Sequence, residues 1–360
     1  MERGRCCPMA GFGRLAAPRE PGRMAQRDAG THDHDERPAR AVLVFLDGVG
    51  IGADAPGNPF AAARMPGIEG LLGGRRPLRE HLDGGGRIDG GRAVLVAADA
   101  TLGVAGLPQS GTGQTTLLTG RNAAAEYGRH FGPWVPTGLR EMLGRENLLA
   151  RARAAGRRPA FANAYPIASI DADPRIFRRP AAPPLAAISA GCLDRDLAEL
   201  AAGRAVASSI TNEQWRRHLG DELAQVTPQE AGRRLAAITA GADVTLFAHY
   251  DTDHVGHRGD AASAVAAVEK VDAFLGALAD ALPPDALLVV ASDHGNLEDP
   301  SAAHTLNPVP VIAAGPGRMA LAERVRSLAD VTPAMLWLLG IAADAVDSPG
   351  AFINRSDLTS

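Results

Sequence analysis

Short, uninterrupted runs of apolar residues recur along the chain, and each run ends in a turn or in charged residues. Runs of this kind are typical of strands buried on both faces, as the strands of a parallel sheet are. In several segments between them, apolar residues recur at every third or fourth position, which is the spacing of helices that bury one side. The pattern predicts strands at 42–46, 93–97, 159–164, 243–248, 286–291 and 309–314, and helices at 60–72, from 110 onward, and at 139–155, 227–240, 261–282 and 331–339. We therefore expect an α/β protein with a mostly parallel sheet.

Two segments interrupt this alternation. Residues 73–92 contain seven glycines and several charges, which predicts a surface loop or a short hairpin. Residues 165–220 show little periodicity and include a run of prolines near 180–184. We interpret this second segment as a small cap inserted into a single core, so that the core consists of residues 40–164 and 221–360.

Residues 1–39 are rich in Arg, Gly, Pro, Asp and His and have no apolar stretch long enough for a signal peptide. This composition predicts a disordered tail, in which the run His32–Asp35 is interpreted as solvated rather than as a metal site. Three cysteines, two of them adjacent at Cys6 and Cys7 and the third at Cys192, exclude a disulfide framework and a thiolate metal site. We therefore expect a cytoplasmic protein.

The charge balance limits the choice of partner. The formal net charge is -4 at pH 7 and 22% of the residues are charged, so the chain has no broad attraction for nucleic acid or for an anionic membrane. The glycine-rich turn after the first predicted strand lacks the GxGxxG pattern, which argues against a dinucleotide site. An anionic small molecule must therefore be bound by a local site.

Three of the predicted strands end in aspartate or histidine. In open α/β sheets, ligands bind beyond the carboxyl ends of the strands, so these side chains are expected to converge. With one further histidine downstream, the set combines carboxylate oxygen with imidazole nitrogen and suits two divalent ions of the Zn or Mn type. The residues are Asp47, Asp253, His257, Asp293, His294 and His304.

Each of these residues also has an ordinary structural interpretation. Asp253 and His257 are four residues apart in a segment predicted as a loop after a strand; they can chelate one ion together, but the segment alone is equally consistent with a surface loop. Asp47 follows a wholly apolar strand, where a carboxylate is costly unless it is paired or bound to metal, and its alternative is a helix N-cap. For His249 and His254, a supporting or solvated role is favoured over metal binding.

The order and the sequences of these motifs resemble those of the alkaline phosphatase superfamily, and most closely those of its cofactor-independent phosphoglycerate mutase and phosphopentomutase branch. The resemblance covers residues 41–122 and 243–342, including the sequence LADVTPAML at 328–336, but not the predicted cap. It implies a three-layer α/β/α sandwich, a serine or threonine nucleophile and two metal sites. The implied first site is Asp47, Ser110, Asp293 and His294, and the implied second site is Asp253, His257 and His304.

The nucleophile is expected at the start of the helix that begins at residue 110, whose first backbone amides favour an anion. The resemblance implies that it precedes a glycine by three residues, which selects Ser110 over the runner-up Thr112. Gln114 stands where the family usually has a histidine after this glycine, so it becomes a candidate substrate contact. Arg175 and Arg178 in the predicted cap are the other candidates for binding substrate.

The leading hypothesis is a metal-dependent phosphohydrolase or phosphotransferase that acts on a small phosphate ester through phosphorylated Ser110. An intramolecular phosphomutase is the alternative. Mutases of the family use a large cap and a basic cluster with lysine, whereas this cap is short and the only lysine, Lys270, lies in a predicted helix. An inactive protein that binds a phosphorylated ligand is less expected, because every ligand position is filled. Two divalent ions, Mn or Zn, are the expected cofactors.

Overall fold

The computed structural model describes residues 37–299 and 304–342. The described residues all fall in one compact unit. The predicted tail, with its His32–Asp35 run, lies outside the described residues apart from residues 37–39, so its disorder stays a prediction. No helix within the described residues is both long and apolar enough to cross a membrane.

Within the described residues, seven strands form one sheet at the centre of the fold. They are β1 (Arg40–Leu46), β2 (Arg87–Asp89), β3 (Ala93–Ala98), β4 (Pro159–Phe161), β5 (Val244–His249), β6 (Ala286–Ser292) and β7 (Val309–Ala314). Their order across the sheet is β2-β3-β7-β6-β1-β5-β4. The neighbours β6, β1, β5 and β4 are parallel, whereas β7 is antiparallel to both β6 and β3. At one edge, β2 and β3 form an antiparallel hairpin, one of the two forms predicted for this segment.

The apolar runs become strands because both faces of the sheet are covered. Along β1, Leu43 and Phe45 belong to one hydrophobic cluster, and Val42 and Val44 belong to a second cluster on the opposite face. Each face requires apolar side chains, so no polar residue interrupts the run.

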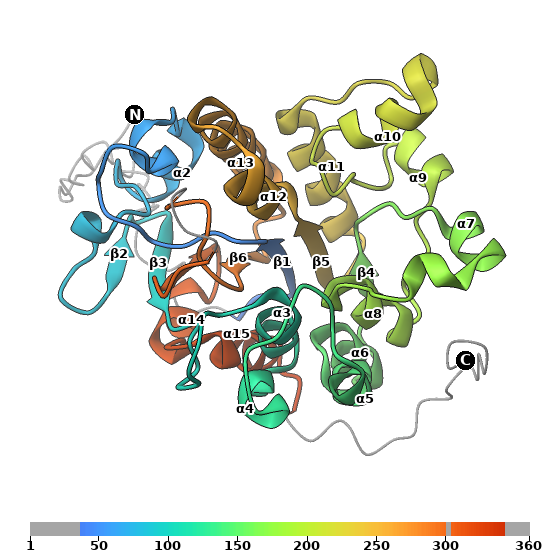
Figure 1. Cartoon of the computed structure of the whole chain (residues 1–360), viewed down its shortest axis with the longest axis horizontal. Coiled ribbons are helices and arrows are strands. Elements are labelled where there is room, and N and C mark those ends of the chain that lie inside the picture. Colours follow the sequence, from blue (N-terminus) through green and yellow to red (C-terminus); the bar gives the residue numbers. More distant parts are fainter. Residues whose placement is uncertain (1–36, 300–303, 343–360) are drawn as a thin grey trace, which may run out of the picture. The chain divides into compact units, whose positions relative to one another are not determined.

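Helices pack on both faces and complete a three-layer α/β/α sandwich (Figure 1), which confirms the predicted fold class. One face is covered by α3 (Ser110–Thr119), α5 (Thr137–Glu146), α6 (Leu148–Ala154), α8 (Ala182–Ser189), α14 (Arg318–Arg324) and α15 (Val331–Leu338). The other face is covered by α1 (Pro59–Ala62), α2 (Pro66–Leu71), α11 (Pro228–Ala240) and α13 (Ala261–Ala281). The described residues also form α4 (Ala123–Tyr127), α7 (Ile167–Ala172), α9 (Leu197–Ala201), α10 (Glu213–Leu219), α12 (Asp251–Arg258) and the short 3-10 helices η1 (Arg79–His81), η2 (Pro174–Phe177), η3 (Gly220–Glu222) and η4 (Leu328–Asp330).

Two of the predicted helices are each divided in two. The segment predicted at 60–72 forms α1 and α2, because Pro66 begins a new helix. The segment predicted at 139–155 forms α5 and α6, because the Asn147 side chain accepts a hydrogen bond from Ala150 N (3.0 Å) and donates one to Leu143 O (2.7 Å). Asn147 thus ends one helix and caps the next.

The segment predicted as the cap contains more regular structure than its sequence indicates. The helices α7, α8, α9 and α10 form between residues 165 and 220. Of these, α8 packs into the large core on one face of the sheet through Ala182 and Ala186. By contrast, Leu200 and Ala205 belong to a small separate cluster. The boundaries of the cap stay a prediction.

Candidate metal centre

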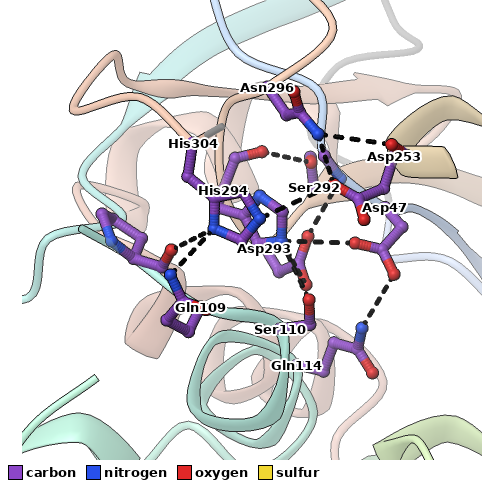
Figure 2. A network of polar contacts seen from close by, with 12 residues as sticks. Asp47, Gln109, Ser110, Gln114, Asp253, Ser292, Asp293, His294, Asn296 and His304 are labelled. Atoms are coloured by element: carbon purple, nitrogen blue, oxygen red, sulfur yellow. Dashed lines mark hydrogen bonds and ion pairs between the residues drawn. The ribbon is translucent and has the colours of Figure 1, made fainter. Parts of the chain in front are cut away.

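Most of the predicted ligands lie at or just after the carboxyl ends of three adjacent parallel strands, whereas Ser110 begins α3 and His304 precedes β7. Asp47 directly follows β1, and Asp293 directly follows β6. On the other side of β1, β5 ends at His249 and the chain turns into α12. The strand register aligns Leu46 with both His249 and Ser292, so the three strand ends meet at one edge of the sheet. Figure 2 shows side chains from these ends and from α3 pointing toward one another.

One group of side chains surrounds His294. Its Nε2 atom lies 3.0 Å from Ser110 Oγ, 3.4 Å from Asp47 Oδ1 and 3.7 Å from Asp293 Oδ2 (Figure 2). All four residues are buried, and Gly48 N donates a hydrogen bond to the other oxygen of Asp293 (3.3 Å). The structure therefore brings together every residue of the implied first site.

A second group, Asp253, His257 and His304, lies beside the first. His257 Nε2 is 3.4 Å from Asp253 Oδ2 and 3.2 Å from His304 Nε2. His304 Nε2 is also 3.8 Å from Asp253 Oδ1. The His304 ring stacks on the His294 ring with 3.8 Å between their centroids, so the two groups are in direct contact.

The structure corrects the prediction that Asp253 and His257 lie in a loop. Both residues are on α12, where a spacing of four places them on one side of the helix. Asp253 is in the first turn and His257 in the last, which is the arrangement that the helix dipole favours. Gly256 serves close packing rather than a bend, because a Cβ there would lie 2.7 Å from the Asn296 side chain.

The electrostatics of the first group fit a cation. Asp47 Oδ1 and Asp293 Oδ2 are buried and have no hydrogen-bond partner among the described residues. Burial, followed by the charge of Asp253, raises the pKa of Asp47 well above its usual value. Burial, followed by the charge of Asp47, does the same to the pKa of Asp293. A divalent ion would offset this repulsion and occupy the free oxygens, so these residues fit a metal.

In the second group, the ring of His304 is held in place by the segment before α3. Its Nδ1 atom lies 2.7 Å from Pro108 O and 3.1 Å from Gln109 Nε2, which leaves Nε2 facing His257. Burial, followed by the neighbouring His294, lowers the pKa of His304 to about 4. The ring is therefore neutral near pH 7, as a metal ligand must be.

Glu298 joins the loops that contain predicted ligands, and it was not among the predicted site residues. Its Oε2 atom accepts hydrogen bonds from Gly50 N (2.8 Å) and Asn296 N (2.9 Å). Its Oε1 atom accepts hydrogen bonds from Thr305 Oγ1 and from Asn307 Nδ2 (3.1 Å). Glu298 is buried, and position 50 has room only for a glycine, because a Cβ there would lie 2.1 Å from Oε1.

Two more supporting side chains were missed. Asn296 donates a hydrogen bond from Nδ2 to Asp253 Oδ1 (2.7 Å), which ties α12 to the loop after β6. Ser292 Oγ donates to His294 O (3.1 Å) and accepts from Val49 N (2.8 Å), which ties that loop to the turn after β1. Residues of this type are common in turns, so the sequence alone gave no signal for them.

The candidate substrate contacts lie in different surroundings. Gln114 is buried, donates from Nε2 to Asp47 Oδ2 (3.1 Å) and accepts at Oε1 from Ala182 N (3.3 Å), so it holds a predicted ligand and anchors α8. Arg175 is exposed and pairs with Asp173 (2.8 Å). Arg178 is exposed, and its backbone carbonyl accepts from Arg140 Nη2 (3.1 Å). Contact of these residues with substrate stays a prediction.

Part of the chain matches a known superfamily. Residues 226–343 match the model of the metalloenzyme superfamily. A solved structure of a protein from Pyrococcus horikoshii shares the fold, with a TM-score of 0.50 and 12% identity over 85% of this chain and 98% of that one. The alkaline phosphatase of the Antarctic bacterium TAB5 aligns over 86% of this chain and 100% of its own, with 11% identity and a TM-score of 0.47.

The similar curated proteins are 2,3-bisphosphoglycerate-independent phosphoglycerate mutases. The chain is 40% identical to that of Syntrophotalea carbinolica over 122 residues, which is 32% of this chain and 23% of the relative. It is 39% identical to that of Paracoccus denitrificans over 132 residues, which is 34% of this chain and 25% of the relative. The chain thus spans about a quarter of the length of these relatives. The predicted resemblance is confirmed: the chain resembles an alkaline phosphatase-superfamily metalloenzyme of the phosphoglycerate mutase-like branch.

Proposed function

We propose that the chain is a metal-dependent phosphohydrolase or phosphotransferase that acts on a small phosphate ester through phosphorylated Ser110. The observation that supports this most directly is the position of Ser110. Its Oγ atom lies 3.0 Å from His294 Nε2, and the residue lines a hollow together with Asp253, His257 and His304. The attacking oxygen and the second predicted ligand group therefore face one space, as a nucleophile and a phosphate-binding group must.

The residues divide into two sets that would each hold one divalent ion. Asp47, Ser110, Asp293 and His294 would hold one, and Asp253, His257 and His304 would hold the other, with ligand types that suit Mn or Zn. Such ions, when bound, lower the pKa of a coordinated hydroxyl and offset the negative charge of the phosphate.

The chain itself supplies the nucleophile and hydrogen-bond donors. In the first step, Ser110 gives up its hydroxyl proton to water, a bond forms between Ser110 Oγ and phosphorus while the ester P–O bond breaks, and the leaving alkoxide takes up a proton from water to become the alcohol. Among the described residues, the backbone amides of Ser110 and Gly111 make no hydrogen bond, whereas Thr112 N donates to Phe131 O (2.9 Å). These first amides of α3 are therefore available to phosphate oxygens. Water then attacks the phosphoserine and releases phosphate.

An intramolecular phosphomutase is the second candidate, because the curated relatives bear that name. It requires that phosphate return from Ser110 to a different hydroxyl of the same molecule. Mutases of this family use a lysine in their basic cluster. The only lysine of this chain, Lys270, lies on α13 and pairs with Glu213 (3.3 Å), away from the candidate site. A small cap also leaves the phosphoserine accessible to water, so we expect hydrolysis.

One experiment tests both candidates. The protein, loaded with Mn²⁺ or Zn²⁺, is mixed with a panel of phosphate esters and quenched in acid, and the phosphorylated residue is located by intact mass and peptide mapping. A label on Ser110 with release of free phosphate is the expected result. Conversion of a substrate into its positional isomer without free phosphate would establish the mutase. The absence of any phosphorylated residue and of turnover would refute the proposal.

A further inference from the structure

The lining of the hollow beside Ser110 indicates which alcohol parts of a phosphate ester fit there. This inference rests on the proposed function. Four of its lining residues are the nucleophile and the second ligand group already described. The other three are Leu107, Gln109 and Pro133. No lysine or arginine is among the described residues that line the hollow.

Leu107 and Pro133 present apolar surface to the hollow. Leu107 is 42% exposed and is one of a few large apolar side chains at the surface of the described residues. Single exposed apolar residues are common and carry no meaning by themselves. Leu107, however, lies three residues before the predicted nucleophile and lines the same hollow, so a bound ester would contact it.

Among the described lining residues, Gln109 is the one polar side chain besides the nucleophile and the second ligand group. Its Nε2 atom lies 3.1 Å from His304 Nδ1, but that nitrogen also lies 2.7 Å from Pro108 O, to which it donates when His304 Nε2 is the metal ligand. The Gln109 amide is neutral, so it offers a carboxylate hydrogen bonds but no opposite charge.

Arginines occur near this lining but contact other groups. Arg129 lies over the ring of Phe131 (6.0 Å) and Arg179 over the ring of Trp134 (4.4 Å), on either side of Pro133 in the loop. Arg79 donates to Asn307 Oδ1 (2.8 Å). None of the three lines the hollow.

We infer that the site prefers phosphate monoesters whose alcohol part is uncharged and apolar, such as aryl or alkyl esters, over esters that bear a carboxylate or a second phosphate. The phosphate would be bound by the ions that the two ligand groups hold and by the first amides of α3, and the alcohol part would lie against Leu107 and Pro133. A carboxylate at that position would lose part of its water without gaining an arginine or a lysine, because the ions would already be engaged by the phosphate. The resulting preference is at least about tenfold in kcat/KM, the scale on which an apolar pocket discriminates.

The test compares two substrates in the full-length protein loaded with Mn²⁺, in two variants of Leu107, in one control variant and in two arginine variants. Phenyl phosphate and 3-phosphoglycerate are assayed by phosphate release, isomer formation and phosphoserine formation. We expect phenyl phosphate to be preferred by at least about tenfold in the unmodified protein. Leu107→Arg introduces a cation at the hollow and shifts the ratio toward 3-phosphoglycerate by about tenfold or more. Leu107→Ala lowers kcat/KM for phenyl phosphate several-fold and leaves that for 3-phosphoglycerate unchanged.

Ile188→Arg is the matched control, because Ile188 is 40% exposed on α8 and does not line the hollow. It is expected to leave the ratio unchanged. A preference of the unmodified protein for 3-phosphoglycerate, lost in Arg129→Gln or Arg179→Gln, would overturn the inference while leaving the proposed function intact. An equal response of the ratio to Ile188→Arg and Leu107→Arg would also overturn it. Failure of both esters to phosphorylate Ser110 or to turn over would instead count against the proposed function itself.

Discussion

Ser110 and Thr112 have the same functional group, but their surroundings differ. Thr112 is fully buried, and its hydroxyl donates to Gln109 O (3.2 Å) and accepts a hydrogen bond from Phe131 N (3.1 Å). Its role is to join α3 to the loop that contains Phe131. Ser110 Oγ faces His294 and the hollow instead. This contrast supports Ser110 as the nucleophile.

Ser110→Ala is expected to reduce turnover by about 10³-fold or more, since the attacking oxygen is removed. The variant should still bind metal, because Asp47, Asp293 and His294 remain. Thr112→Ala is expected to be much milder and to act through local stability. Stopped assays, metal analysis and acid-quench peptide mapping distinguish these outcomes. A phosphoryl label on Thr112, or full turnover by Ser110→Ala, would show that the nucleophile is assigned wrongly.

At the scale of elements, Glu298 determines how the ligand-bearing loops meet. In Glu298→Gln, the backbone amides of Gly50 and Asn296 cannot reorient, so the new amide nitrogen must face Thr305 and Asn307. The Thr305 hydroxyl can rotate and accept, but the Asn307 amide nitrogen can only donate, so the Asn307 side chain must move or turn. We expect metal affinity to fall about 10–100-fold, as it does when groups that orient ligands are altered. Calorimetric titration of the metal-free protein measures this change directly.

The control for Glu298→Gln is Asp272→Asn, the same chemical change at another buried carboxylate. Asp272 on α13 accepts hydrogen bonds from Gly67 N (3.0 Å) and Ile68 N (2.7 Å) at the start of α2. Its substitution should lower the free energy of unfolding by about 1–3 kcal/mol and leave metal affinity unchanged. Equal losses of metal affinity in both variants would mean that Glu298 acts only through general stability.

The contact of α12 with the loop after β6 requires a residue without a side chain at position 256. In Gly256→Ala, the new Cβ would lie 2.7 Å from Asn296, so α12 must move away with Asp253 and His257. We expect a loss of metal affinity of about tenfold or more. Gly138→Ala on α5 is the matched change, because nothing lies within 4 Å of its Cβ. It should stabilise the helix by up to about 1 kcal/mol and leave metal binding unaltered. Unchanged metal affinity in Gly256→Ala would contradict the described packing.

For the molecule as a whole, the buried carboxylates make stability depend on pH once metal is removed. The pKa of Asp47 and of Asp293 is raised on folding, chiefly by burial. Between the usual and the raised pKa, the folded state therefore binds more protons than the unfolded state, and stability falls as pH rises. We expect the melting temperature of chelator-treated protein to fall as the pH rises above the usual pKa of an aspartate, and added Mn²⁺ or Zn²⁺ to remove the loss.

Asp293→Asn isolates this effect, because it removes one of the two titrating charges. His304, whose pKa is lowered to about 4, has the opposite sign, since its contribution is complete above its usual pKa and is lost as the pH falls. The change of stability with pH that His304 causes is present in both the variant and the unmodified protein, so it cancels when the two are compared. If melting temperature had the same pH dependence in the variant and in the unmodified protein, the carboxylates would not be the cause.

The sequence allowed much of the fold and of the candidate site to be predicted, since both depend on strand ends. Apolar runs identified β1, β5 and β6. Parallel pairing brings the carboxyl ends of these strands together, whatever the conformation of the loops between them. The helix α12 was missed because Asp251–Arg258 is largely polar and has no apolar stripe. Glu298 was missed because one acidic residue in a loop has no pattern; its partners come together only through tertiary contacts. The direction of β7 likewise depends on packing that periodicity does not encode.

The position of His294 has a consequence for how ions enter the centre. The residue belongs to two potential ligand groups, one with Asp47 and Asp293 and the other with Asp253 and His304. Because its ring also stacks on His304, an ion that fixes one ring restrains the other. The two ions are therefore not expected to bind independently, since the same ring takes part in both groups. A titration of metal-free protein that fits two independent sites would show that the shared ring does not connect them.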